Sequence, residues 1–196
     1  MKNSTSSATL DQVEPRVKLS LKDLVLVSLF CALIAIGAFI RVPVPVVPFT
    51  LQLLFTMLAG LLLGPRLGAL SVMLYLALGL IGLPIFTEGG GLWYFLKPTF
   101  GYLIGFAVGS YVTGRLTQRP DISLRHILVA NFAGLFVVYL FGLVYLYVIM
   151  NAVLGTPIGL WSVFLYGFVL AVPGDIALCF LAALLALRLI PILRSR

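Results

Sequence analysis

Residues 49–83 read FTLQLLFTMLAGLLLGPRLGALSVMLYLALGLIGL and carry a single charged side chain, Arg66. The apolar run is interrupted once, by Gly64, Pro65 and Gly68, which are residues that end helices and form turns. Nearly uncharged aliphatic runs of this kind are typical of membrane-spanning helices. The stretch therefore predicts two short apolar helices joined by a tight hairpin.

The rest of the chain has the same character, since 62% of its 196 residues are hydrophobic and 10% are charged. This leaves too little polar surface for a water-soluble globule, and the unbroken apolar runs lack the alternation of β-barrel strands. We predict an all-α polytopic membrane protein, a six-helix bundle, with a polar tail at 1–21, a membrane domain at 22–190 and a second tail at 191–196. The expected spans are 22–40, 49–63, 67–83, 99–115, 127–150 and 160–187.

The positive charges predict the orientation of the bundle. An even number of spans places both termini on one side, together with eleven of the thirteen Lys and Arg residues, and leaves Arg41 and Lys97 on the other. Because cytoplasmic loops carry the excess of cations, we expect both termini in the cytoplasm. The same distribution explains the net charge of +7 without a nucleic-acid partner.

Two segments are expected outside the membrane core, at 41–50 and 84–99. The first contains three prolines, and the second contains three consecutive glycines followed by Trp93, Tyr94 and Lys97. The second segment has two interpretations: an interfacial aromatic belt or a lid over a pocket that opens outward.

The sequence contains no recognisable catalytic or metal-binding motif. There is no nucleotide-binding P-loop, the one histidine is His126 at an expected helix start, and Cys31 and Cys179 lie inside spans. We therefore predict that the chain is not an enzyme, holds no metal, and depends on another chain for any energy-driven transport.

Asp175 is the strongest single indication of a site, because a carboxylate inside a membrane span costs about 3 kcal/mol on insertion scales. Either a buried polar neighbour or a ligand in a cavity could offset that cost. Pro173 predicts an interrupted helix beside it. Tyr139 is expected at a similar depth, whereas Asn131 is expected nearer the cytoplasmic end.

Small residues at helical spacing mark one face of the first span. Ser28 with Ala32, and Cys31 with Ala35, form small-x-x-x-small pairs that allow another helix to approach closely. Packing within the bundle and docking of a partner helix explain this face equally well.

Four blocks of sequence carry a resemblance to a known family: residues 47–91 with their PFTLQ opening and GPRLGAL hairpin, PTFGYLIGF at 98–106, VVYLFG at 137–142, and VPGD at 172–175. Together they resemble the BioY family, the biotin-specific substrate-binding (S) subunits of energy-coupling factor (ECF) transporters. The resemblance implies a bacterial cell-membrane protein with an outward-facing pocket and no cofactor. It would bind biotin and work with a transmembrane coupling subunit of the EcfT type and two cytoplasmic ATPases, in contact with membrane lipid.

The resemblance also implies roles for particular residues. Asp175 would accept a ureido N–H of biotin, Lys97 would pair with its carboxylate, and aromatic residues would pack its apolar part. The candidate contacts are Asp175, Lys97, Trp93, Tyr94, Tyr139, Asn131, Gln52 and Phe49, and the candidate docking residues are Ser28, Ala32 and Ala35. The alternative function is a stand-alone facilitator or channel for a small solute, which would require a more continuous polar path.

Overall fold

A computed structural model describes residues 19–42, 46–119 and 123–194. Most of the predicted N-terminal tail, and the last two residues of the predicted C-terminal tail, lie outside this part of the chain.

The described residues confirm the all-α fold and its six helical units. Five units are nearly continuous helices, and the sixth consists of three consecutive helical pieces. They are α1 (Leu21–Phe39), α2 (Gln52–Leu63), α3 (Pro65–Ile81), α4 (Phe100–Leu116), α5 (Leu124–Val148) with the π-helix η2 (Ile149–Val153), and finally α6 (Leu160–Phe164), the π-helix η3 (Leu165–Val169) and α7 (Val172–Arg194).

Three stretches of the described chain, Leu21–Phe39, Leu124–Val153 and Leu160–Ile192, are long and apolar enough to cross a membrane. Large apolar side chains such as Val129, Phe136 and Val144 are exposed along α5. Such a surface is unfavourable in water and favourable against lipid. The protein is therefore a multi-pass membrane protein.

The hairpin predicted at Gly64–Pro65 is present, and its geometry follows from these two residues. Gly64 ends α2 with a φ of +82°, a value that side chains with a Cβ rarely adopt. Pro65 is the first residue of α3, where its missing N–H costs no helical hydrogen bond. The chain reverses there without a loop.

Short segments fill the space beyond the outer ends of α2 and α3. Strands β1 (Arg41–Val42) and β2 (Phe49–Thr50) pair antiparallel, with Arg41 opposite Thr50. After α3, the chain forms an isolated bridge between Phe86 and Gly89 and then the 3-10 helix η1 (Leu92–Leu96).

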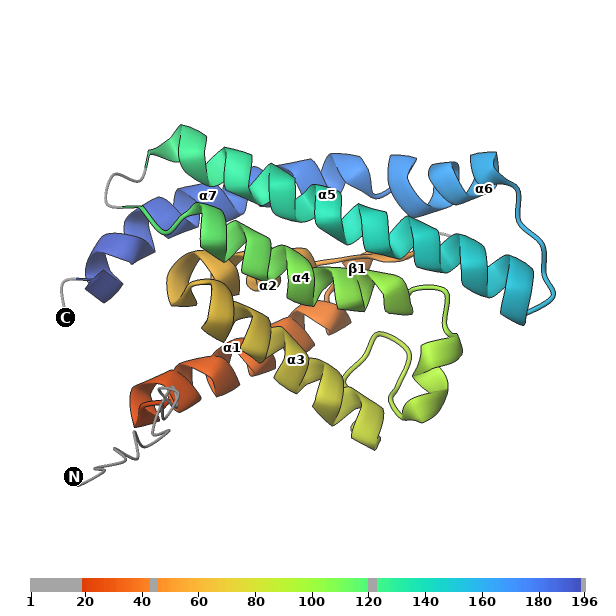
Figure 1. Ribbon diagram of the computed structural model, residues 1–196, viewed down its shortest axis with the longest axis horizontal. Helices are drawn as coiled ribbons and strands as arrows, with labels where there is room; N and C mark the ends of the chain where they lie inside the picture. The colour runs from red at the N-terminus through yellow and green to blue at the C-terminus, as the bar shows by residue number, and fades with distance from the viewer. Residues whose placement is uncertain (1–18, 43–45, 120–122, 195–196) are drawn as a thin grey trace, which may run out of the picture.

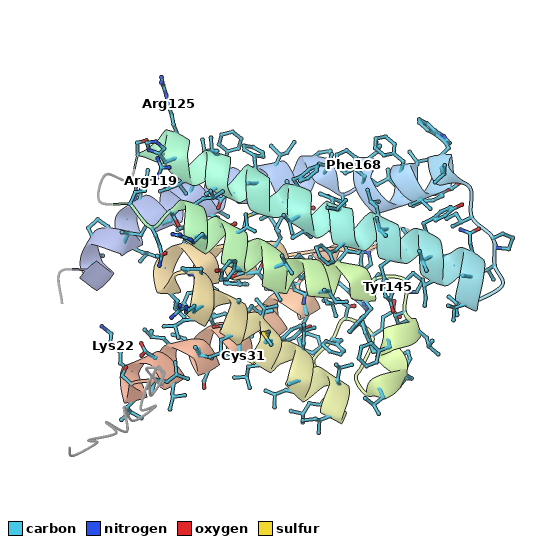
Figure 2. All side chains as sticks on the ribbon, in the orientation of Figure 1. Lys22, Cys31, Arg119, Arg125, Tyr145 and Phe168 are labelled. Carbon is cyan, nitrogen blue, oxygen red and sulfur yellow. The ribbon has the colours of Figure 1, made fainter. Side chains whose placement is uncertain are left out.

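Figure 1 shows that α1 begins and α7 ends at the same end of the bundle, which also holds the α2–α3 turn and the link from α4 to α5. Lys22, Arg119 and Arg125 lie at this end (Figure 2). We call it the cation-rich end. The strands β1 and β2 and the 3-10 helix η1 lie beyond the other ends of α1, α2 and α3.

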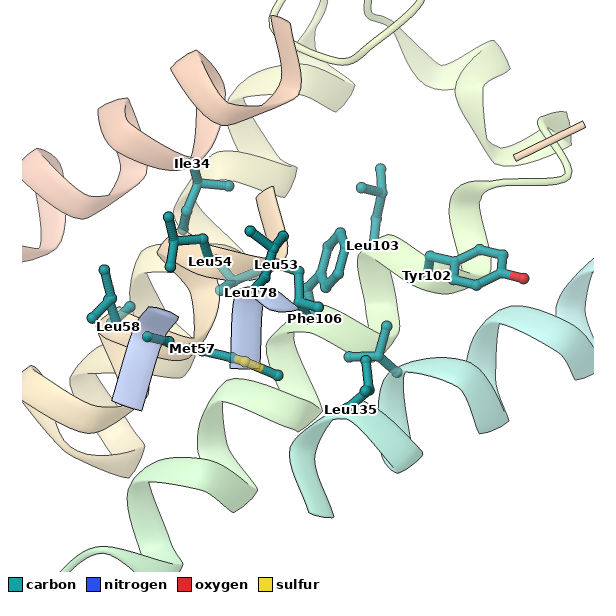
Figure 3. Close-up of a cluster of buried hydrophobic side chains, with 14 of the residues drawn as sticks. Ile34, Leu53, Leu54, Met57, Leu58, Tyr102, Leu103, Phe106, Leu135 and Leu178 are labelled. Carbon is teal, nitrogen blue, oxygen red and sulfur yellow. The ribbon is translucent and has the colours of Figure 1, made fainter. Parts of the chain in front are cut away.

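The core lies where α2, α4, α5 and α7 meet. Figure 3 shows its central side chains, among them Leu53, Met57, Phe106 and Leu178, which are buried. Because these residues come from spans far apart in sequence, the core holds the whole bundle together.

The last unit is interrupted beside Asp175, as Pro173 predicted. The interruption lies at residues 170–171, where η3 ends and α7 begins. Asp175 consequently lies in the first turn of α7. A carboxylate there interacts favourably with the helix dipole, so its burial costs less than it would in mid-helix.

Candidate functional site

A cavity lies between α4, α5 and the start of α7, beneath the β-hairpin and the segment that leads to η1. Its volume is about 50 Å³, and it is partly open to solvent. Its lining is mostly apolar and aromatic, with a few polar groups, which is typical of small-molecule sites. The lining residues are Val47, Pro48, Phe49, Thr50, Leu53, Thr87, Tyr94, Thr99, Tyr102, Leu103, Phe106, Val138, Tyr139, Ala171 and Asp175.

Asp175 is the one ionisable carboxylate of this lining. Tyr139 Oη of α5 donates a hydrogen bond to its Oδ2 at 2.5 Å. No described residue donates to Oδ1, so the carboxylate keeps acceptor capacity for a ligand. The two interpretations of Asp175 are thus combined, because it has a polar partner on a neighbouring helix and also lines a cavity.

Aromatic side chains form the wall around this carboxylate. The Tyr102 ring lies 6.1 Å from that of Tyr139, nearly perpendicular to it. Phe168 packs edge-on against Tyr139, with the ring centroids 4.7 Å apart. Tyr102 Oη donates to the Gly167 carbonyl at 2.7 Å, so its hydroxyl is satisfied within η3. The ring faces therefore offer apolar surface beside a charged acceptor.

Glycine makes this aromatic wall sterically feasible. A Cβ at Gly142 of α5 would lie 2.3 Å from Tyr102 Cε1. A Cβ at Gly167 would lie 2.8 Å from Tyr102 Oη. Any larger residue at either position would push Tyr102 out of its place in the wall.

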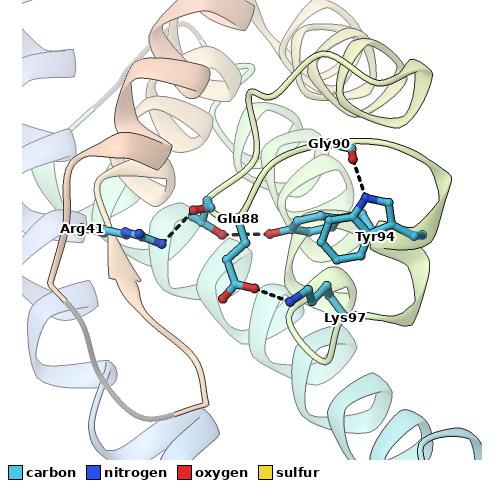
Figure 4. A network of polar contacts seen from close by, with 7 residues as sticks. Arg41, Glu88, Gly90, Tyr94 and Lys97 are labelled. Carbon is cyan, nitrogen blue, oxygen red and sulfur yellow. Dashed lines mark hydrogen bonds and ion pairs between the residues drawn. The ribbon is translucent and has the colours of Figure 1, made fainter.

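The outer rim of the cavity is held by polar contacts between the two loop segments (Figure 4). Arg41 Nη1 donates to the Thr87 carbonyl at 2.7 Å, and the Thr87 and Tyr94 hydroxyls are hydrogen-bonded at 2.8 Å. Tyr145 donates a hydrogen bond to the Phe95 carbonyl, which ties η1 to α5. These contacts join the β-hairpin, the 84–91 segment, η1 and α5 into one cover.

The structure brings four of the predicted contact residues together at the cavity: Asp175, Tyr139, Tyr94 and Phe49. Phe49 also fixes the start of α7, because a Cβ at Gly174 would lie 2.5 Å from its ring. Four residues from α5, α7, η1 and β2 thus line one cavity.

The other four predicted contact residues do not line this cavity. Lys97 Nζ lies 2.5 Å from Glu88 Oε2 and 5.0 Å from the Trp93 ring centroid, and Trp93 is exposed. Gln52 donates to Tyr75 Oη at 3.0 Å. Asn131 is buried and donates to the Cys179 carbonyl at 2.8 Å, a contact that joins α5 to α7.

The predicted docking residues lie along α1. Ser28 and Ala32 are exposed, and Ala35 is half-buried. Leu24, Val25 and other apolar side chains are exposed on the same helix.

Helix α4 contributes to the cavity, which was not predicted from the sequence. Thr99, Tyr102, Leu103 and Phe106 all line it. Their spacing of three, four and seven residues places them on one helical face, and that pattern was available in the sequence. The face was not recognised because α4 is apolar on all sides, so a pocket-lining face has the same composition as a packed one.

Comparison with known proteins places this fold and cavity in context. The family model described as "BioY family" matches residues 8–195. A "Probable biotin transporter BioY" of Lysinibacillus sphaericus is 48% identical over 88% of this chain and 88% of its own length. A "Biotin transporter BioY" of Thermotoga maritima is 38% identical over 86% of this chain and 96% of its own.

A solved structure agrees with these sequence relatives. It is described as the S-component for biotin from an ECF-type ABC transporter, and it matches with a TM-score of 0.74 and 30% sequence identity. The match covers 89% of this chain and 92% of the other. The arrangement of helices, as well as the sequence, is therefore shared.

Proposed function

The chain belongs to the BioY family, and on that premise we propose that it is the biotin-binding S component of an ECF-type ABC transporter. The observation that carries this function is the cavity in which Asp175 and Tyr139 face an aromatic wall. Relatives named as biotin transporters, and a solved structure named as a biotin S-component, support a binding and transport role.

The polar ureido ring of biotin and the apolar remainder of the molecule both suit the chemistry of this cavity. Its ureido ring presents two N–H donors, and the Asp175 carboxylate is a charged acceptor that makes stronger hydrogen bonds than a neutral group. Its thiophane ring and alkyl chain are apolar and would pack against Tyr102, Tyr139 and Tyr94. We assign the ureido ring to the deep end of the cavity, beside Asp175.

Lys97 is the proposed partner of the biotin carboxylate. It lies at the rim rather than in the lining, and its ammonium group is paired with Glu88. The tail of the ligand would therefore have to replace Glu88 as the partner of Lys97. Both side chains of this ion pair are partly exposed, so such an exchange is inexpensive.

The cavity is proposed to open to the outside of a bacterial cell membrane, with both termini in the cytoplasm. Its cover consists of η1 and the β-hairpin, which lie at the end opposite the cation-rich end. Cytoplasmic ends of membrane proteins carry the excess of Lys and Arg. Biotin would then be captured from outside.

Transport would require partner chains, because this chain has no nucleotide-binding motif. We propose a transmembrane coupling subunit of the EcfT type and two cytoplasmic ATPases. The exposed face of α1, with Ser28 and Ala32 accessible and Ala35 beside them, is the proposed docking surface. Small side chains there allow a partner helix to approach closely.

Mass spectrometry of the purified protein tests whether it retains biotin. Calorimetry of variants tests whether Asp175 binds biotin. Wild type should retain biotin, and Asp175→Asn should weaken binding by at least about 100-fold, because a charged acceptor is lost. The matched control is Asp23→Asn in the first turn of α1, which should bind like wild type. Unchanged affinity of Asp175→Asn would refute the role of Asp175, and biotin uptake by the protein alone in liposomes would favour a facilitator.

A further inference from the structure

A second cavity lies at the cation-rich end, between the first turn of α3 and the last turns of α4. It is lined by Leu63, Pro65, Arg66, Leu67, Tyr111, Arg115 and Gln118. It is distant in the fold from the proposed biotin cavity, and the two share no lining residue. Its polar side chains, with an arginine from each wall, distinguish it from an apolar groove between helices.

Close packing of backbones brings the two arginines to the same cavity. A Cβ at Gly114 of α4 would lie 2.6 Å from the Pro65 nitrogen and 2.8 Å from the Gly64 carbonyl carbon. The α2–α3 turn is therefore in van der Waals contact with α4 one residue before Arg115. Because Arg66 immediately follows Pro65, both guanidinium groups are attached to backbones that touch.

The last turns of α4 and the residue just beyond them supply the polar groups of the second wall. Tyr111 and Arg115 are four residues apart, so they lie above one another on the helix, and Gln118 follows the C-cap Thr117. Arg115 Nη1 donates to Gln118 Oε1 at 3.4 Å, a long contact that leaves most of its donors free. Arg66 and Arg115 make no ion pair with any described residue, and Tyr111, Arg115 and Gln118 are exposed.

The unpaired arginines indicate the chemistry of the ligand. A guanidinium group presents several N–H donors in a planar fork that matches the oxygens of a phosphate group. Tyrosine is enriched at the boundary between lipid and water, where Tyr111 is 45% exposed. Basic pockets between helices at the cytoplasmic surface of a membrane are suited to anionic lipid head groups.

We propose that Arg66 and Arg115, with Gln118 and Tyr111, bind the phosphate group of an anionic phospholipid. Leu116 and Val108, which are also exposed on α4, would lie beside its acyl chains. A lipid held here would contact α3 and α4 together and fix the depth of the hairpin in the membrane. The proposal does not depend on the identity of the transported ligand.

Native mass spectrometry of the full-length protein, titrated with phosphatidylglycerol or phosphatidylcholine, tests the site. Wild type should retain phosphatidylglycerol at least about tenfold more strongly than phosphatidylcholine. Arg66→Gln/Arg115→Gln should abolish the difference, and Arg66→Lys/Arg115→Lys should keep part of it, because the charge remains and the fork is lost. The matched control is Arg125→Gln, a cation at the same end outside this cavity, which should retain the preference. Biotin affinity should be unchanged in all of them.

Three results would overturn the proposal. The first is equal retention of phosphatidylglycerol by wild type and the double Gln variant. The second is competition by inorganic phosphate at concentrations equal to those of the lipid, which would identify a free phosphate site. The third is an absence of lipid preference in wild type, combined with loss of assembly with the ATPase partners in the double Gln variant, which would identify the arginines as contacts to a protein.

Discussion

Helix α4 packs in opposite ways at the corner that it forms with α2 and α3 at the cation-rich end and at the proposed biotin cavity. At the corner, the helices touch through backbone atoms. A Cβ at Gly60 would lie 2.3 Å from the Ser110 carbonyl oxygen, and one at Gly68 would lie 2.7 Å from Gly60 Cα. No side chain separates the helices there.

At the cavity, large side chains separate α4 from α5 and β2. Tyr102 and Phe106 of α4 stand opposite Tyr139 of α5 and Phe49 of β2, and space remains between them. The difference shows that side-chain volume along α4 decides where the bundle closes and where it can hold a ligand. A rigid closed corner also gives the cavity walls a fixed base, because α2 and α4 contribute to both regions.

The largest effect is expected from filling the closed corner. Gly60→Val would place side-chain atoms where the Ser110 carbonyl oxygen already lies, and backbone in the middle of two helices cannot move aside. We expect a loss of more than about 3 kcal/mol of stability and little folded protein. Thermal unfolding in detergent and the yield of monodisperse protein measure the loss.

The matched control for this variant is Gly159→Ala, because a Cβ at Gly159 meets nothing within 4 Å. It should unfold at the same temperature as wild type. If Gly60→Val folded and melted like the control, the corner would not be closed by backbone contact, and the contrast between the two ends would be lost.

A smaller effect is expected at the cavity, where a change should alter binding and leave the fold intact. Tyr139→Phe keeps the ring and removes the hydroxyl that donates to Asp175. Without this donor the buried carboxylate is less well satisfied, so biotin affinity should fall by about tenfold. Calorimetry measures the change, and thermal unfolding shows whether the bundle is affected.

Tyr147→Phe is the control for this variant, since Tyr147 is on the same helix and 40% exposed, outside the cavity lining. It should bind biotin like wild type. An unaltered affinity of Tyr139→Phe, together with loss of binding in Asp175→Asn, would mean that Asp175 acts without its tyrosine partner.

The two ends also differ in how far the sequence predicts them. The closed corner follows from local signals: Gly64 and Pro65 specify the turn, and apolar runs on either side specify the helices. The helical fold and its six helical units were predicted correctly for the same reason, although the last helix runs to Arg194 rather than ending near residue 187.

The cavity depends on contacts between residues far apart in sequence, and there the prediction was incomplete. Asp175, Tyr139, Tyr94 and Phe49 were predicted as ligand contacts, and in the structure all four line one cavity. The interruption beside Asp175 was predicted from Pro173, whereas the π-helical turn η3 was not, because such turns leave no distinct pattern in a uniformly apolar sequence. The position of Asp175 in the first turn of α7, which lowers the cost of its charge, was therefore not predicted either.

The smallest effect is expected at the rim, at the ion pair between Lys97 and Glu88. Variants of this pair test whether it stays intact when biotin binds or is replaced by a contact between Lys97 and the ligand. If the biotin carboxylate replaces Glu88 as the partner of Lys97, then Glu88→Gln removes the competitor and should tighten biotin binding by about threefold. Lys97→Ala should weaken it by a similar factor. Biotin methyl ester has no carboxylate, so its affinity should be the same in wild type and both variants.

Calorimetry with the two ligands separates this exchange from a simple loosening of the cover. A cover held shut by the ion pair would open in either variant, and both biotin and its ester would then bind less tightly to each. Opposite shifts for biotin in Glu88→Gln and Lys97→Ala, with no shift for the ester, require that Lys97 meets the ligand tail. Because both side chains are partly exposed, water screens the pair, and the shifts are expected to stay within a few-fold.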